Sequence, residues 1–369
     1  MSKKILFFTG GAYVAGLEIM MLTLIRGLKD KGNDVRCVIN GWNDGDFKNR
    51  LSEIDVPYYE VKLGWLYLKK PTWTFDTLIN YPKAYITCKK VLKDFKPDVV
   101  NFTSYAMPIM LYPLIKANSF YTLHDTQLPY LKHRIIYKLL KKKIGTFIAV
   151  SNHIADILRN LSIPNEKIKV IYNGVAAPDF LLVSKKMAIE NTFCFAIIGQ
   201  IIGLKGHGIL INSVELLAKK GITNFKVFII GNNNNDYSKL LVEQIAEKNI
   251  TSFFVWKGFI KNKEEIYSGI DAVIIPSLCT EAFSLTTAET MIRGLGVIAS
   301  NLGGIKELID PGENGLLFKV GDAEELSECM DKLMQERGYN EILGVKAKKK
   351  ALTNFTDQAM TDNYLEIYT

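Results

Sequence analysis

Two glutamates flank a predicted helix start in the last third of the chain, in a pattern that suits a phosphate-bearing sugar. The apolar run 272–275 ends in Pro276 and Ser277, and Glu281 and Glu289 follow. The first backbone N–H groups of a helix have no intrahelical acceptor and bind phosphate readily. Carboxylates beside them can accept hydrogen bonds from sugar and ribose hydroxyls. The stretch therefore favours a sugar-nucleotide pocket.

Two other interpretations of these glutamates have to be weighed. Thr286 and Glu289 have the spacing of a capping box, in which Glu289 would only accept a backbone hydrogen bond. A hydrolytic pair of Glu281 and Glu289 is disfavoured, because eight residues of helix span about 12 Å and glycosidase carboxylates lie roughly 5 to 9.5 Å apart. The capping box stays open at this point.

Both halves of the chain predict the scaffold that would position these residues. Short apolar runs alternate with helical patterns, which is typical of parallel sheets covered by helices. The predicted strands are residues 4–8, 35–39, 99–102, 120–123, 147–150, 170–172, 193–198 and 227–230, and the predicted helices are 17–31, 209–219 and 237–248. Two such open sheets bind ligands at the carboxyl ends of their strands, which makes a cleft between them the expected active site.

Composition narrows the class of protein further. A length of 369 residues suits two domains. The five cysteines are scattered without a C-x-x-C spacing, which disfavours a disulfide framework or a zinc site and predicts a reducing, cytoplasmic setting. No run approaches the roughly 18 apolar residues of a membrane span. Residues 1–180 carry 26 Lys and Arg against 15 Asp and Glu, a net charge of +11, while residues 181–369 carry 20 against 23, a net charge of −3, so that the whole chain has +8.

The order of short motifs along the chain resembles the family-4 retaining glycosyltransferases of the GT-B fold. Segments 293–300, 303–309 and 314–318 follow the two glutamates, and segments 124–125, 150–151, 171–175, 198–200 and 205–206 precede them in the family's order. The resemblance implies an α/β fold with two Rossmann-like domains facing each other across a deep cleft. Residues 1–176 would form the acceptor domain and 177–355 the nucleotide-sugar donor domain, and a helix within 356–369 would cross back onto the acceptor domain.

The resemblance also implies roles for the matched residues. Lys205 would bind the departing diphosphate, where a fixed positive charge lowers the barrier, and Glu281 would contact the sugar hydroxyls. Glu289 would hold the ribose, and His124 would lie near the reaction centre. The positions that would contribute mainly their backbone are Gly16, Phe283, Ser284 and Leu285 at phosphate and sugar, and Ile260 at the nucleobase.

One position departs from the family's pattern. Gln200 stands where an arginine usually shares the diphosphate with the lysine, and glutamine has neither the charge nor the bidentate fork of arginine. A non-catalytic nucleotide-sugar-binding subunit is therefore an alternative function. Asp44-Gly45-Asp46 has the form of a metal-binding D-x-D but is more simply a polar turn, so we expect no metal and no cofactor beyond the nucleotide sugar.

The function that the resemblance implies is transfer of a hexose-type sugar from a nucleotide diphosphate sugar, UDP-linked by family frequency. The acceptor would be a surface glycan or a lipid-linked glycan in polysaccharide biosynthesis, for a capsule or lipopolysaccharide. A nucleotide-sugar epimerase or hydrolase of the same fold is a second alternative.

The basic charge of the first half points to an anionic partner. Residues 131–143 interleave leucine and isoleucine with lysine and arginine, which fits a helix lying on an anionic membrane and fits equally a basic surface helix with its apolar side in the core. Residues 65–73 combine aromatic and basic side chains as membrane-interface belts do. We hypothesise peripheral attachment to the inner face of the cytoplasmic membrane, and expect no nucleic acid because no recognition module accompanies the charge.

Overall fold

The computed structural model describes residues 2–9, 11, 13–64, 71–126, 131–178 and 192–368. The chain forms two compact units, residues 1–174 together with 357–369, and residues 175–356. Residues 179–191, which follow the predicted domain boundary, and most of the aromatic segment (65–70) lie outside the described residues.

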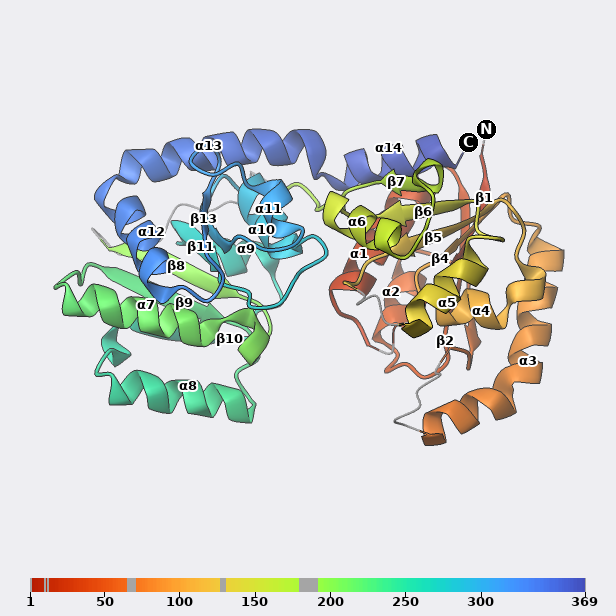
Figure 1. The fold of residues 1–369 in the computed structure, drawn as a ribbon, viewed down its shortest axis with the longest axis horizontal. Coiled ribbons are helices and arrows are strands. Elements are labelled where there is room, and N and C mark those ends of the chain that lie inside the picture. Colours follow the sequence, from red (N-terminus) through yellow and green to blue (C-terminus); the bar gives the residue numbers. More distant parts are fainter. Residues whose placement is uncertain are drawn as a thin grey trace. The chain divides into compact units, whose positions relative to one another are not determined.

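The first unit is a parallel sheet of seven strands in the order β3-β2-β1-β4-β5-β6-β7 (Figure 1). Its strands are β1 (Lys4–Phe8), β2 (Asp34–Asn40), β3 (Tyr58–Val61), β4 (Val99–Phe102), β5 (Ser119–Leu123), β6 (Thr146–Ala149) and β7 (Ile168–Val170). Its helices are α1 (Gly16–Asp30), α2 (Asp46–Glu53), α3 (Pro71–Phe95), α4 (Ala106–Met110), α5 (Leu131–Leu140) and α6 (Asn152–Asn160), with 3-10 turns η1 (Tyr112–Leu114) and η2 (Asn165–Lys167).

Different helices pack on the two faces of this sheet. Helix α14 (Asp357–Ile367) packs on α1, and just beyond its end the Tyr368 hydroxyl accepts a hydrogen bond from Asn101 of β4 at 2.6 Å. The opposite face presents Phe8 and Phe102, which are paired in register and stacked with ring centroids 4.7 Å apart. Tyr121 lies beside Phe102 on that face and contacts Tyr137 of α5. The last helix thus completes the core of the first unit.

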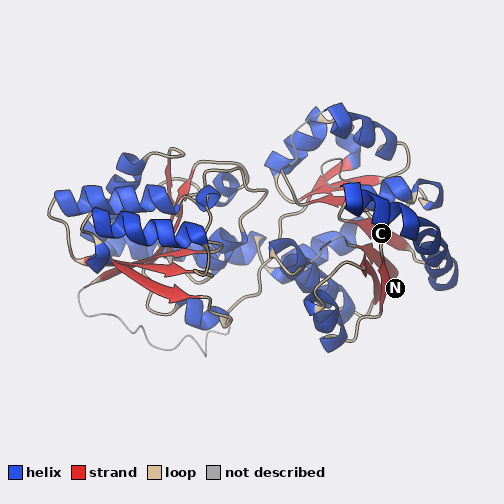
Figure 2. Ribbon diagram, turned by 90° about the horizontal axis from the view of Figure 1, so that it is seen from below, coloured by secondary structure: helices blue, strands red, loops and turns tan. Residues whose placement is uncertain are grey.

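The second unit is a parallel sheet of six strands in the order β10-β9-β8-β11-β12-β13, with helices on both sides (Figure 2). Its strands are β8 (Phe193–Ile198), β9 (Phe225–Ile230), β10 (Phe254–Gly258), β11 (Ala272–Ile275), β12 (Gly296–Ser300) and β13 (Leu316–Phe318). Its helices are α7 (His207–Lys219), α8 (Asp236–Glu247), α9 (Lys263–Tyr267), α10 (Leu285–Ile292), α11 (Ile305–Leu308), α12 (Ala323–Gln335) and α13 (Arg337–Asn354), with 3-10 turns η3 (Gly203–Lys205) and η4 (Thr251–Phe253).

The predicted fold class, two parallel α/β sheets with a last helix on the first domain, is confirmed. The strand expected at 170–172 instead occupies Ile168–Val170, because these residues pair with Phe147–Ala149 of β6. Helix α3 was not predicted, and it contains Pro82 in its interior. Within the described residues, no helix combines the length and apolarity needed to span a membrane.

Candidate functional site

The site in the second unit is built where two loops meet beyond the carboxyl ends of β8 and β11. One loop carries η3 and ends at Gly206, and the other begins at Pro276. A Cβ atom on Gly206 would lie 1.8 Å from the carbonyl oxygen of Pro276, and the residue has φ +76°. Glycine is therefore required for this approach. The backbone N–H of Leu278 donates to Leu204 O at 2.8 Å and joins the two loops.

Lys205 and Glu281 form an ion pair at this junction. The Lys205 Nζ atom lies 2.7 Å from Glu281 Oε1, and the Glu281 carboxylate is much less exposed than the lysine. Ser277 donates its hydroxyl to the same carboxylate oxygen at 2.5 Å. Burial raises the pKa of Glu281, but the charge and hydrogen bond of Lys205, with hydrogen bonds from Ser277 and Ser284, outweigh burial and leave that pKa lowered. Glu281 is thus held ionised as a hydrogen-bond acceptor.

Helix α10 begins directly after Ser284, which has the left-handed values φ +87° and ψ +87°. Such values are uncommon for a residue with a side chain. With this turn, the N-terminus of α10 and its free N–H groups lie next to the Lys205–Glu281 pair, since Thr286 lines the same small cavity as the pair. A small cavity of about 20 Å³ is lined there by Lys205, Glu281 and Ser284. Phe283 points away from it, since it is buried and packs edge-on against Phe355.

Glu289 lies one helical turn further along α10 and has partners of its own. Lys263 of α9 pairs with its Oε1 atom, and the Tyr267 hydroxyl donates to Oε2 at 3.1 Å. The capping-box interpretation is wrong, because the cap residue is Ser284 rather than Thr286 and the Glu289 carboxylate contacts side chains of α9. Its carboxylate is instead available to a ligand that can compete with Lys263.

Two further predicted residues lie in loops of the second unit. Gln200 follows β8 and is exposed, two residues beyond the last residue of the strand. Ile260 is half-buried and follows Gly258, the last residue of β10, which has φ +67°. Both therefore lie at the carboxyl edge of the sheet, as expected of ligand-binding residues in an open parallel sheet.

His207 was missed by sequence reasoning although it lines the same small cavity. It begins α7, is 2% exposed, and its Nδ1 atom has no hydrogen-bond partner among the described residues. Burial lowers the pKa of His207 to about 4, with a smaller contribution from the charge of Lys205. The signal in the sequence was its place two residues after Lys205, where a helix starts.

Gly16 and His124 lie in the first unit. Gly16 is the first residue of α1, and the preceding Ala15 N–H donates to Glu18 Oε2 at 3.0 Å. His124 follows β5, and its Nε2 atom is buried without a partner in the described part of the chain. Burial lowers the pKa of His124 to about 3, so its ring is neutral at physiological pH. Glu18 is buried and its pKa is raised mainly by burial, a group that sequence reasoning did not single out.

The acidic pair Asp44 and Asp46 is part of a turn. The Asp46 N–H donates to Asp44 Oδ1 at 3.0 Å, and Asp46 pairs with Arg50 at 3.0 Å on the first turn of α2. Across the described ranges, no group of three or more His, Cys, Asp or Glu side chains is placed to hold a metal ion.

Comparison with known families matches almost the whole chain in two parts. Residues 14–177 match the family described as Glycosyltransferase Family 4. Residues 182–350 match the family described as Glycosyl transferases group 1.

Individual relatives are distant. An uncharacterized glycosyltransferase of Methanocaldococcus jannaschii is 24% identical over 56% of this chain and 54% of its own length. The capsular polysaccharide biosynthesis glycosyltransferase CapM of Staphylococcus aureus is 24% identical over 64% of this chain and 65% of its own length. The matched region thus spans about half to two thirds of these relatives. The solved structure of Anabaena HepE in complex with UDP-glucose is similar in fold, with a TM-score of 0.79 and 20% identity over 99% of both chains.

Proposed function

We propose that this chain, which belongs to the family 4 glycosyltransferases of group 1, transfers a hexose-type sugar from a UDP-linked donor to a growing glycan. The proposal includes retention of the anomeric configuration and a surface-glycan or lipid-linked acceptor in polysaccharide biosynthesis. The HepE structure with UDP-glucose supports the choice of donor, and the name of CapM supports the choice of product class.

The observation that carries the proposal is the Lys205–Glu281 pair at the start of α10. Departure of a nucleoside diphosphate builds negative charge on a phosphate oxygen, and a preorganised ammonium group with helix N–H donors stabilises that charge. Glu281, held ionised by its neighbours, can accept hydrogen bonds from the hydroxyls of the transferred sugar. The same junction therefore offers donors to the diphosphate and an acceptor to the sugar.

Glu289 and Ile260 extend the donor site along the sheet edge. The hydroxyls of a ribose would donate hydrogen bonds to the Glu289 carboxylate and would replace its contact with Lys263. The backbone at Ile260, after β10, would meet the nucleobase. The proposal keeps His124 of the first unit as a catalytic residue, and its imidazole would act in the neutral form, since burial holds its pKa low. In a same-face mechanism the leaving phosphate deprotonates the acceptor, which needs no carboxylate nucleophile from the protein.

The proposal is tested by calorimetric titration with UDP, GDP and ADP, followed by product analysis with UDP-glucose. We expect UDP to bind most tightly, and Lys205→Ala to weaken it while Lys219→Ala, an exposed lysine of α7, leaves it unchanged. A retained α-configuration in the product supports transfer. Formation of an epimerised UDP-sugar would instead support the epimerase. Binding of UDP-glucose with no release of sugar, even when glycan acceptors are present, would support the non-catalytic subunit.

Peripheral attachment to an anionic membrane is proposed from the surface of α5. Leu131, Ile135 and Leu139 are 75%, 54% and 42% exposed, while the core contacts of α5 come from His133, Tyr137 and Leu140. The alternative, a basic surface helix with its apolar side in the core, therefore does not hold for these three side chains, whereas Ile136 is half-buried. An exposed apolar stripe beside lysines is the pattern of an interfacial helix, although Leu140 of the predicted apolar set is buried.

A further inference from the structure

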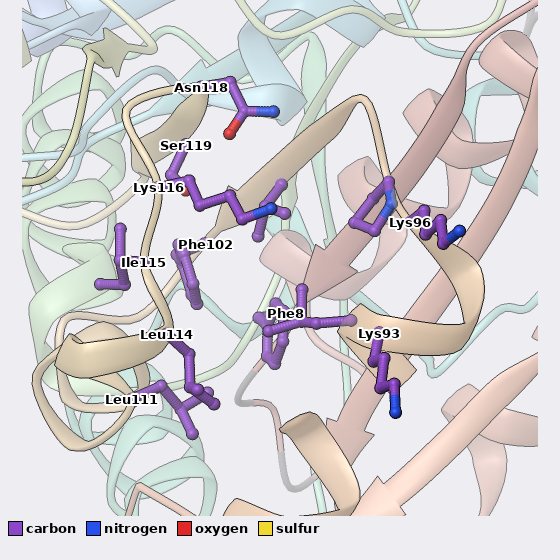
Figure 3. A pocket seen from close by; sticks show the side chains of 13 residues that line it. Phe8, Lys93, Lys96, Phe102, Leu111, Leu114, Ile115, Lys116, Asn118 and Ser119 are labelled. Carbon is purple, nitrogen blue, oxygen red and sulfur yellow. The ribbon is translucent and has the colours of Figure 1, made fainter. Parts of the chain in front are cut away.

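A second cavity lies within the first unit, on the sheet face opposite α14. It has a volume of about 390 Å³, within the range of small-molecule sites. Phe8, Val100 and Phe102 of the sheet form its floor, and Leu111, Leu114 and Ile115 around η1 form one wall. We call it the α3 pocket, because the last turn of α3 forms the other wall (Figure 3).

The interior of the α3 pocket is hydrocarbon in character. Phe8 and Phe102 stack at its base, and Val100 continues the same face of β4. Leu111 and Ile115 are buried, while Leu114 is half-buried at the entrance. An apolar chain that enters a space lined by such side chains leaves water for a hydrocarbon environment, which lowers the free energy.

The rim of the α3 pocket is basic on two sides. Lys93 and Lys96 stand on the α3 side and Lys116 on the η1 side, as Figure 3 shows. All three are exposed, and none pairs with a carboxylate of a described residue. None of the residues that line the pocket is acidic, and the Oδ2 atom of the neighbouring Asp98 accepts a hydrogen bond from the Lys4 N–H at 2.8 Å. The charge at the entrance is therefore net positive.

We propose that the α3 pocket binds the hydrocarbon chain of an anionic amphiphile, with a phosphate or carboxylate head group at Lys93, Lys96 and Lys116. The apolar floor selects the chain, and the lysines select the sign of the head group, which stays in contact with water. This site is separate from the donor-binding residues, which belong to the second unit, and the inference does not depend on glycosyl transfer.

Calorimetric titration of the whole chain with monomeric alkyl phosphates tests the chain requirement. Hexyl, octyl and decyl phosphate should bind with dissociation constants that fall about fourfold per added methylene, the factor expected for burial of each CH₂ group. Decyl trimethylammonium, which has the same chain and the opposite charge, should bind far more weakly. Equal binding of both decyl compounds, or affinity independent of chain length, overturns the proposal.

Matched variants locate the binding. The triple variant Lys93→Gln, Lys96→Gln, Lys116→Gln should weaken decyl phosphate by about tenfold. The control Lys83→Gln, Lys90→Gln, Lys220→Gln removes the same charge from exposed positions outside the pocket and should bind as wild type does. Leu114→Glu, which places a carboxylate at the entrance, should abolish binding, with the melting temperature confirming that the variant is folded. Equal losses in triple variant and control overturn the proposal.

A vesicle experiment distinguishes the two sources of such a ligand. If Leu114→Glu loses decyl phosphate and also loses binding to phosphatidylglycerol vesicles, the pocket takes a membrane lipid. If vesicle binding is unchanged, the pocket takes a free amphiphile. If the Leu114→Glu variant binds decyl phosphate as tightly as the wild type does, the amphiphile does not bind in the α3 pocket.

Discussion

Lys205 and Glu281 are joined by a 2.7 Å ion pair although 76 residues separate them in the chain. The pair sets the charge of the proposed donor site. In that proposal a diphosphate that reaches Lys205 would compete with Glu281 for the ammonium group, and the carboxylate would then be free to accept hydrogen bonds from sugar hydroxyls. Loss of either partner leaves the other buried or half-buried without its counter-charge, so the two residues cannot be regarded as independent.

Lys205→Ala should lower turnover by 10²-fold or more, because one lost preorganised donor costs about 3 to 4 kcal/mol at the transition state. The measurement is UDP release from UDP-glucose with an acceptor that supports wild-type turnover. Lys219→Ala on the exposed side of α7 is the matched control. A fall smaller than about fivefold would contradict the role given to Lys205.

Glu289→Ala should raise the KM for the donor more than it lowers kcat, because ribose contacts are equally strong in the ground and transition states. Lys263→Ala should have the opposite effect on KM, since it removes the side chain that occupies the Glu289 carboxylate. Steady-state kinetics over a range of UDP-glucose concentrations gives both values. An unchanged donor KM in Glu289→Ala, together with a lower melting temperature, would leave Glu289 a purely structural role.

Much of the fold could be predicted because its strands are short apolar runs between polar turns. The strands 4–8, 99–102 and 193–198 were predicted with the bounds that the structure has. Helix α3 was not predicted, because Phe75, Leu78, Ile79 and Ile86 are exposed while its buried positions include Thr77 and Cys88. Apolar residues on the solvent side blur the helical period on which such predictions depend.

The side-chain contacts of the candidate site could not be predicted from the sequence. The spacing of Glu281 and Glu289 showed two carboxylates near a helix start, yet only the three-dimensional structure pairs one with Lys205 and the other with Lys263. The left-handed conformation of Ser284 could not be recognised from the sequence, because serine rarely adopts it. Such long-range pairs and backbone angles are set by tertiary packing, which local patterns do not encode.

Ser284→Gly should leave the second unit within about 1 kcal/mol of wild-type stability. A non-glycine residue with positive φ stores roughly 1 to 3 kcal/mol of strain, which glycine relieves, but glycine costs about 0.5 to 1 kcal/mol through the entropy of the unfolded chain. Both Ser284→Gly and Ser284→Ala lose the hydrogen bond from Thr287 Oγ1 at 2.9 Å, which costs about 1 kcal/mol. Ser284→Ala should be the less stable of the two variants, because alanine also keeps the strain. Urea unfolding of both variants tests this order, and equal losses of stability would show that φ +87° is not strained here.

His207 should make folding stability depend on pH. Its folded pKa of about 4 lies below the ordinary 6.5, so the unfolded chain binds the proton more readily between these values. Stability is therefore complete above about pH 6.5 and is lost as the pH falls towards 4, by up to about 2 kcal/mol at pH 5. His207→Gln should flatten this slope in urea unfolding at pH 7 and pH 5. The same slope in both proteins would mean that His207 does not titrate in this range.

The exposed stripe of α5 gives the sharpest test of membrane attachment. Gln substitutions of Leu131, Ile135 and Leu139 should reduce co-sedimentation with phosphatidylglycerol vesicles, because buried apolar area provides part of the binding. Ile342, Val345 and Leu352 of α13, with exposures of 55%, 70% and 42%, offer a matched control stripe in the other unit, and their Gln variants should bind as wild type does.

The contribution of charge to membrane binding is tested with the exposed lysines of α5 and of the residues just after it. Lys132, Lys138 and Lys142 are exposed, whereas the Lys141 ammonium donates to Ser162 O and that of Lys143 lies over the Tyr112 ring. Gln substitutions of the three exposed lysines should weaken vesicle binding by about 1 kcal/mol per charge, and added salt should mimic them, because exposed charges are screened within about 8 Å at physiological ionic strength. Donor affinity should stay level, since the residues proposed to bind the donor lie in the second unit. Binding that ignores both salt and these lysines would assign the stripe to a protein partner rather than to an anionic membrane.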